Sequence, residues 1–236
     1  MATATQHKVV SHEEWIAART AFLAKEKEFT KQRDEVSRQR RELPWEKVEK
    51  NYVFEGPNGR QTLSDLFGKN SQLIVYHFMF APDWDEGCEG CSFWADNFNL
   101  IPTHLNARDT AFVSVSRAPV AKLEAFKRRM GWSFPWFSSD DGDFNYDFGA
   151  SFRPEEVEAE SAFFNYRQQN PYLADREGAS VFFKDENGDI YHTYSTFARG
   201  IDLMNTAYNY LDLTPKGRDE PDNGNPNNWL KLRDEY

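Results

Sequence analysis

The chain has little of several residue types on which common protein functions depend. Among its 236 residues are 2 Cys and 5 His, and the histidines are scattered singly rather than spaced as metal ligands. Lys and Arg number 28 against 38 Asp and Glu, which gives a formal charge of −10. Because phosphate binding relies on Lys and Arg, this balance argues against nucleic acid or an anionic membrane as the main partner.

Cofactor motifs and long apolar runs are also missing. We find neither a phosphate-binding glycine-rich loop nor a dinucleotide fingerprint, so we expect no cofactor and no metal. Residues 1–11 lack the apolar segment of a signal peptide, and no stretch approaches the length of a membrane span. We therefore expect a cytoplasmic protein. In a reducing compartment, a single Cys-x-x-Cys motif is more often catalytic or metal-binding than structural.

The chain does contain one closely spaced thiol pair. Cys88-Glu89-Gly90-Cys91 lies between an apolar run at 73–80 and an amphipathic segment at 92–105, in the order strand, loop, thiols, helix. Backbone N–H groups and the dipole of a helix N-terminus favour a thiolate there. We predict that Cys88 attacks a disulfide and that Cys91 resolves the mixed disulfide.

Three other interpretations of the thiol pair stay open. It could be half of a zinc site, a static disulfide, or two buried inert thiols. A zinc site needs two further ligands, and a disulfide across so short a loop constrains little of the unfolded chain. The polar loop at 82–87 belongs at the surface, which argues against burial of both thiols. Redox use is the preferred hypothesis.

Two residues near the pair are candidates for supporting roles. His77 lies on the strand that enters the site, where a neutral imidazole could accept the proton of Cys91. The alternative is a core histidine with a backbone partner. Trp84 precedes the pair and could shield the disulfide and contact the partner, or it could fold onto the core.

The charged residues near the pair include one candidate binding residue, Arg117, and several acids. Arg117 follows the apolar run at 110–116, so it should lie at the sheet edge where open α/β sheets bind ligands. It could hold an anionic group, but an ion pair with Asp83 or Asp85 is favoured. The acidic residues beside the thiols oppose the helix dipole, which leaves the direction of the Cys88 pKa shift open.

The hydropathy pattern predicts an α/β chain in three parts. A capping box at Ser11 and apolar residues every seven positions predict a helix over 12–41, which could pack on the chain's own sheet or on a second subunit in a homodimer. We predict a helical extension at 1–45, a domain at 46–213 with an insertion at about 140–175, and a tail at 214–236. The insertion includes a helical stretch at 153–169.

Within the domain, strands and helices alternate. Strands at 73–80 and 110–116, with a helix at 120–130, indicate a parallel sheet with crossovers. A hairpin at 181–194 and a helix at 201–211 follow. This order resembles the thioredoxin fold, a three-layer α/β/α sandwich with a mixed central sheet. Thioredoxins carry a proline facing the disulfide, and the resemblance gives that position to Ala179 or Ser180, which makes Ser180 a candidate binding residue.

Most of the chain resembles a bacterial family of unknown function whose members are predicted to be dithiol-disulfide oxidoreductases. The resemblance is carried by the segments at 43–45, 76–80, 87–96, 116–119 and 144–148. It implies thiol-disulfide exchange with a protein or small-molecule disulfide and a thiol reductant.

Two further functions remain as alternatives. The segments at 134–140 and 182–188 resemble thioredoxin-like thiol peroxidases, although Asp85 stands where those enzymes place Thr or Ser before the reactive cysteine. The third hypothesis is a non-catalytic binding protein on a thioredoxin scaffold.

Overall fold

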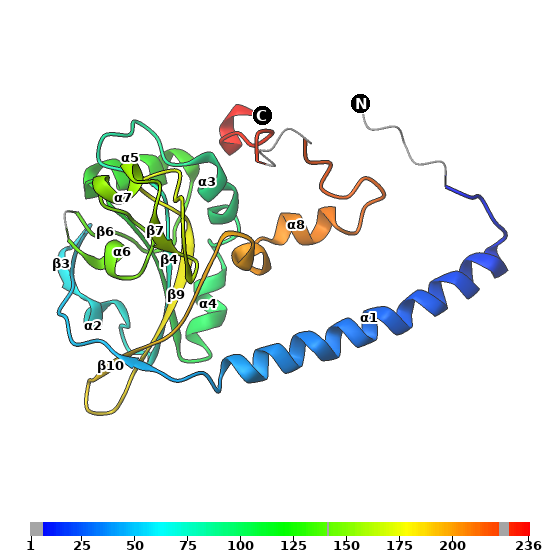
Figure 1. The fold of residues 1–236 in the computed structure, drawn as a ribbon, viewed down its shortest axis with the longest axis horizontal. Coiled ribbons are helices and arrows are strands. Elements are labelled where there is room, and N and C mark those ends of the chain that lie inside the picture. Colours follow the sequence, from blue (N-terminus) through cyan, green and yellow to red (C-terminus); the bar gives the residue numbers. More distant parts are fainter. Residues whose placement is uncertain (1–6, 141, 222–226) are drawn as a thin grey trace. The chain divides into compact units, whose positions relative to one another are not determined.

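The computed structural model describes residues 7–140, 142–221 and 227–236. The chain divides into two units, residues 1–44 and 45–236. The first contains one long helix, α1 (His12–Arg40), and the second contains all of the strands that the structure describes (Figure 1). No helix in the described ranges combines the length and the apolarity that a membrane crossing requires.

Helix α1 confirms the helix that the sequence predicts. Its capping box is complete, because the Ser11 side chain accepts from the Glu14 backbone at 3.2 Å and the Glu14 carboxylate accepts from Ser11 N at 3.0 Å. Arg38 and Arg40 lie in the last turn, where positive charge complements the helix dipole. A single helix cannot enclose its own apolar stripe, so this unit has no core of its own.

The second unit is built on a mixed sheet of eight strands among the described residues, in the order β1-β10-β9-β4-β5-β6-β2-β3. The strands are β1 (Glu46–Lys47), β2 (Val53–Gly56), β3 (Gly59–Thr62), β4 (Gln72–His77), β5 (Thr110–Ser116), β6 (Trp136–Ser138), β9 (Gly178–Lys184) and β10 (Ile190–Phe197). Strand β4 is parallel to β5 and antiparallel to β9, and β9 forms a hairpin with β10. This β5-β4-β9-β10 arrangement is the central sheet of the thioredoxin fold, as the sequence predicts.

Helices cover both faces of this sheet, which makes three layers. One core cluster combines the sheet with α3 (Glu89–Ala95), α5 (Val120–Met130) and α8 (Thr206–Leu211). The other cluster combines it with α2 (Leu63–Leu66) and α6 (Phe144–Asp147). The remaining elements are α4 (Ile101–Asn106), α7 (Pro154–Glu158), η1 (Ala198–Met204), η2 (Arg233–Glu235), β7 (Ala162–Phe164) and β8 (Arg167–Gln169).

The cysteine helix is shorter than the single helix predicted over 92–105. Helix α3 ends at Ala95, and α4 begins at Ile101 with Pro102 in its first turn. Between them, the Asn97 amide donates to the carbonyls of Phe93 at 2.9 Å and Trp94 at 3.2 Å. These bonds satisfy carbonyl groups that a helix leaves open at its C-terminus.

Two other helix predictions were only partly correct. The stretch predicted as helical over 153–169 is helical only in α7, and then forms the hairpin β7–β8 around a turn at Asn165 and Tyr166. The helix predicted over 201–211 is divided into η1 and α8. It breaks at Asn205, whose side chain accepts from the Tyr208 backbone at 3.1 Å and caps α8.

Candidate functional site

The two thiols are held by the start of α3 and by the backbone that leaves β4. Cys88 is the N-cap of α3 and is partly exposed, whereas Cys91, one turn into the helix, is only 2% exposed. Met79 contacts both residues, because its N–H donates to Cys91 Sγ at 3.4 Å and its carbonyl accepts from Cys88 N at 3.1 Å. Both cysteines are free thiols in this structure.

The environments of the two thiols shift their pKa values in opposite directions. A hydrogen bond from the Cys91 thiol, aided by the backbone N–H groups of Cys91 and Gly90, lowers the pKa of Cys88 against the cost of burial. Burial, together with that same bond to Cys88, raises the pKa of Cys91 well above its usual range. The geometry therefore makes Cys88 the thiolate and keeps the proton on Cys91.

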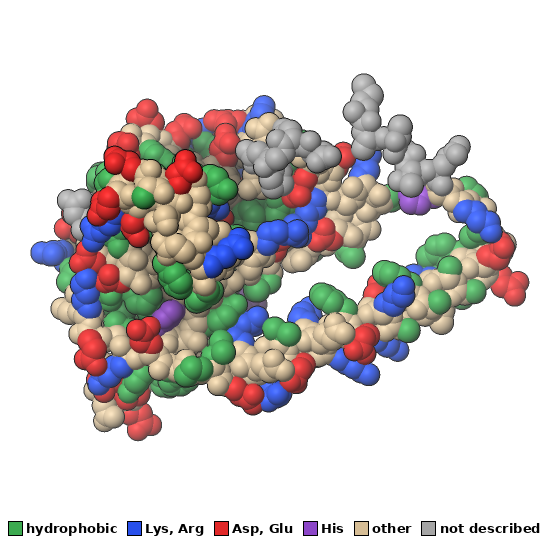
Figure 2. Space-filling model, viewed as in Figure 1, with side chains coloured by type: hydrophobic (Ala, Val, Ile, Leu, Met, Phe, Trp, Pro, Cys, Tyr) green, Lys and Arg blue, Asp and Glu red, His purple; other side chains and the backbone are tan. Residues whose placement is uncertain are grey.

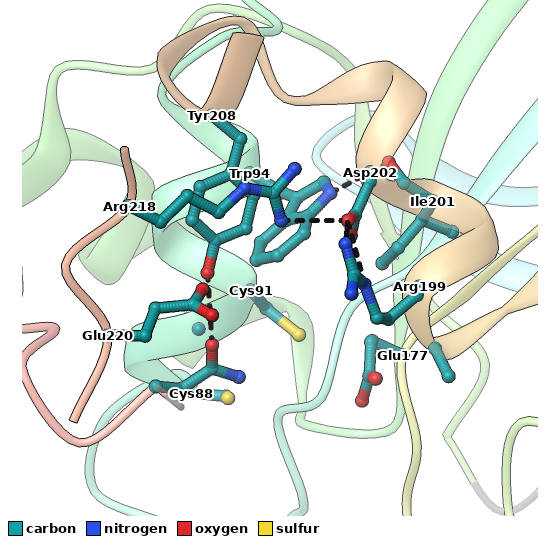
Figure 3. A pocket seen from close by; sticks show the side chains of 13 residues that line it. Cys88, Cys91, Trp94, Glu177, Arg199, Ile201, Asp202, Tyr208, Arg218 and Glu220 are labelled. Carbon is teal, nitrogen blue, oxygen red and sulfur yellow. Dashed lines mark hydrogen bonds and ion pairs between the residues drawn. The ribbon is translucent and has the colours of Figure 1, made fainter. Parts of the chain in front are cut away.

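The thiols open into a cavity of about 230 Å³ (Figure 3). Its opposite wall carries Arg199 and Asp202 of η1, paired at 3.2 Å, and Arg218, which contacts Asp202 at 2.9 Å and stacks over Tyr208. Glu220, which also lines the cavity, interacts with the Tyr208 hydroxyl. The wall of the cavity opposite the thiols is therefore formed by residues that follow β10 in the chain, including residues of the C-terminal segment at 214–236.

The C-terminal segment is anchored beside the cysteine helix. The ring of Trp229 lies 5.5 Å from Phe93 on α3, and Leu230 and Leu232 are buried in the core. These contacts hold the segment against α3.

Glu177 is a site residue that sequence reasoning missed. It immediately precedes β9, lines the thiol cavity, and its negative charge raises the pKa of both Cys88 and Cys91. It stands beside the position that the resemblance to thioredoxin gave to Ala179 or Ser180. The resemblance thus indicates the correct end of β9 but not the residue that faces the thiols.

Tyr76 is the second residue that the sequence analysis missed. It is fully buried in the same core cluster as Cys91, and burial and the nearby Cys91 sulfur raise its pKa well above 10. Its hydroxyl lies close enough to Cys91 to interact but does not have the geometry of a full hydrogen bond, and it has no other partner among the described residues. A phenol so placed can donate to Cys91 when that sulfur becomes charged.

His77 does not reach the thiols. It follows Tyr76 on β4, so its side chain points to the opposite face of the sheet. There its ring bonds Asn145 Oδ1 at 3.0 Å and Ser180 Oγ at 2.8 Å and stacks on Phe144. This placement matches the alternative of a core histidine, although its partners are side chains rather than backbone. Ser180 is buried on the same face and does not line the thiol cavity.

The other two candidates lie outside the thiol cavity. Arg117 forms an ion pair, as expected, but its partner is Asp175, at 2.8 and 2.9 Å, rather than Asp83 or Asp85. Trp84 packs partly against the core, and its carbonyl accepts from Lys122 at 2.7 Å. Of the six residues proposed from the sequence, only Cys88 and Cys91 line this cavity.

Comparison with known proteins places the chain in a family. Over residues 4–236 it matches the profile of a family described as a bacterial protein of unknown function, DUF899. The chain belongs to this family. No curated protein matches it. Membership in DUF899 confirms the resemblance to a bacterial family of unknown function.

Solved structures similar to this DUF899 protein include a peroxiredoxin, a peroxidoxin and a thiol:disulfide interchange protein. Peroxiredoxin Q from Xanthomonas campestris is 14% identical, covers 70% of this chain and 91% of its own, and gives a TM-score of 0.46. Peroxidoxin BcpB from Mycobacterium tuberculosis is 15% identical, covers 69% of this chain and 93% of its own, and gives a TM-score of 0.44. A Chlorobium tepidum protein, proposed to be the thiol:disulfide interchange protein DsbE, is 15% identical. It covers 66% of this chain and 86% of its own, and gives a TM-score of 0.40. Similarity at this level carries no inference about activity.

We predict that Glu177→Gln makes Cys88 more reactive. Removing the carboxylate charge lowers the pKa of Cys88, so the thiolate fraction at pH 7 rises. Alkylation of Cys88 by iodoacetamide should become several-fold faster, with its pH midpoint moved down. The matched control is Glu220→Gln, which removes a charge from the same cavity at a residue that contacts Tyr208. An unchanged or slower rate in Glu177→Gln, or an equal gain in the control, contradicts the role given to Glu177.

We also predict that His77 makes the protein sensitive to acid. Burial lowers the pKa of His77 from 6.5 to about 4, so between these values the unfolded chain binds a proton that the folded chain does not. The stability from neutral His77 is complete above pH 6.5 and is lost as pH falls, by roughly 3 kcal/mol at about pH 4. Urea unfolding from pH 7 to 4.5 should show a shallower loss in His77→Gln than in the wild type. Parallel curves would show that His77 does not titrate in this way.

Proposed function

We propose that this DUF899 protein is a thiol-disulfide oxidoreductase that works through Cys88 and Cys91. The observation that carries the proposal is the asymmetry of the pair. Cys88 is accessible at a helix N-terminus with a lowered pKa, and Cys91 is buried with a raised pKa and donates to it. A structural disulfide or two inert core thiols require no such difference.

The reaction has two steps that balance in atoms and electrons. In the first, the Cys88 thiolate attacks one sulfur of the substrate disulfide, and the other substrate sulfur leaves as a thiolate that takes up a proton. In the second, Cys91 gives up its proton and attacks Cys88 Sγ, which releases the remaining substrate thiol. The substrate gains two electrons and the chain keeps a Cys88–Cys91 disulfide, which a cellular thiol reductant reduces again.

The surroundings of Cys91 support the second step. Its pKa is raised by burial, so the thiol needs hydrogen-bond donors as it becomes a thiolate. The N–H of Met79 already donates to it at 3.4 Å, and the Tyr76 hydroxyl lies beside it. Donors that are in place before the charge forms stabilise it without reorganisation.

The cavity supports a substrate that presents its disulfide on a small group, either a small molecule or one side-chain pair of a protein. Its volume is about 230 Å³, below the roughly 300–1,000 Å³ of typical small-molecule pockets. The need for a thiol reductant supports a cytoplasmic setting for this reaction.

Single cysteine variants distinguish the nucleophilic role of Cys88 from the resolving role of Cys91. Cys91→Ser should accumulate a mixed disulfide with glutathione at Cys88, because the thiol that resolves it is gone. Cys88→Ser should form no such adduct, since the remaining thiol is buried and protonated. Both variants should lose disulfide reductase turnover, and intact mass spectrometry detects the adduct.

A Cys88→Ser variant with full reductase activity would overturn the proposal. Fast sulfenate formation at Cys88 under low hydrogen peroxide, with no disulfide reduction, would favour a thiol peroxidase instead.

We predict that Tyr76→Phe slows only the second step. The change removes one hydroxyl without opening a cavity, so Cys88 should still be alkylated at the wild-type rate. Loss of a donor to a charged sulfur should slow resolution of the mixed disulfide by about tenfold. Tyr208→Phe is the matched control, because its hydroxyl lies in the cavity with Glu220 and Asn227. Equal slowing of both steps, or of neither, contradicts the role of Tyr76.

A further inference from the structure

Charged side chains line much of the thiol cavity, and those on the wall opposite the thiols compensate one another (Figure 3). Arg199 and Arg218 both contact Asp202, at 3.2 and 2.9 Å. Arg218 also donates to both carboxylate oxygens of Asp212, at 2.9 and 3.0 Å. Two arginines thus face two aspartates, so this group of ion pairs carries no net charge.

Glu177 lies outside this group, and its charge acts on the reacting sulfurs. It lines the cavity together with Cys88 and Cys91, and it raises the pKa of both thiols. Glu177 pairs with Arg176 at 3.5 Å. Arg176, however, is not among the described residues that line the cavity, and its guanidinium lies over the Phe164 ring. The negative charge of Glu177 is therefore only partly offset where the sulfurs react.

This charge bears on which disulfide the Cys88 thiolate attacks most readily. During the attack, negative charge passes from the Cys88 sulfur to the leaving sulfur of the substrate. A carboxylate nearby makes these charged states less stable. A positive group beside the substrate disulfide is attracted both to Glu177 and to the charged sulfurs, so it offsets that cost. A negative group there adds another like charge and slows the reaction.

Arg199 is the lining residue that would favour the opposite selection. Its side chain is 84% exposed and is already paired with Asp202. Exposed charges are strongly screened by water and salt. The side chain of Glu177 is only 24% exposed, so its charge is screened less than that of Arg199. The balance at the sulfurs therefore favours a cation.

We propose that the preferred substrates are disulfides that carry an amine or another positive group beside the sulfurs, and that Glu177 selects them. The inference rests on the proposed function, because it concerns the disulfide that Cys88 attacks. With cystamine as the substrate, Cys88 displaces one cysteamine and Cys91 then displaces the other. The substrate S–S bond gains two electrons, the proton of Cys91 and one from water go to the leaving sulfurs, and the chain keeps a Cys88–Cys91 disulfide.

The test uses three symmetric disulfides of similar length on the reduced full chain. Cystamine carries ammonium groups, bis(2-hydroxyethyl) disulfide is neutral, and 3,3′-dithiodipropionate carries carboxylates. Formation of the Cys88–Cys91 disulfide is followed by acid quenching and intact mass spectrometry. Each rate is divided by that of the same disulfide with free dithiothreitol, which corrects for the different leaving groups. Cystamine should then react about 3- to 5-fold faster than the neutral disulfide, and dithiodipropionate should react more slowly than it.

Glu177→Gln should bring the normalised ratio of cystamine to the neutral disulfide close to that of free dithiothreitol. A ratio is used because the same change alters the reactivity of Cys88 toward all three disulfides equally. Glu220→Gln is the matched control, since it removes a carboxylate from the same cavity at a residue that interacts with Tyr208. The control should keep the wild-type ratio.

Equal normalised rates for the three disulfides, or a preference for dithiodipropionate, would overturn the inference and leave the oxidoreductase function standing. An equal change of the ratio in Glu177→Gln and Glu220→Gln would overturn the role of Glu177. If none of the three disulfides oxidises the thiols, the proposed function itself fails. Should Glu177→Gln not fold, the wild-type order still decides, and it must weaken as the salt concentration rises.

Discussion

The backbone of Met79 is the point on which the thiol site depends. Its carbonyl accepts from Cys88 N and its N–H donates to Cys91 Sγ, so the segment that follows β4 positions both cysteines. With the thiols so close, the bond between them can lower the pKa of one and raise that of the other. The division of labour proposed for the pair follows from this geometry more than from the helix dipole alone.

Side chains alternate along β4, so consecutive residues lie on opposite faces of the sheet. Tyr76 faces the buried thiol, and His77, one residue later, faces the other layer, where it bonds Asn145 and Ser180. The thiol face can become charged during a reaction. On the other face, His77 is buried in its neutral form with Asn145 and Ser180 as its partners. One strand thus separates the reactive thiols from a buried polar network.

Much of the fold could be predicted from the sequence, because β5 and α5 have simple periodicity and clear ends. Which of Tyr76 and His77 faces the thiols could not be predicted, because β4 is apolar on both faces and its sequence does not reveal which side chain points to which face. Glu177 acts through a contact between segments far apart in the chain. The β7–β8 hairpin was missed because its turn lacks the glycine that usually marks such a turn.

The central claim, that Cys88 and Cys91 form a working redox pair, is tested most directly by a redox titration. The intact protein is equilibrated across a dithiothreitol redox series, alkylated, and weighed by mass spectrometry. The account predicts one reversible two-electron transition in which both thiols disappear together into a Cys88–Cys91 disulfide. Thiols that stay reduced across the whole series would contradict it.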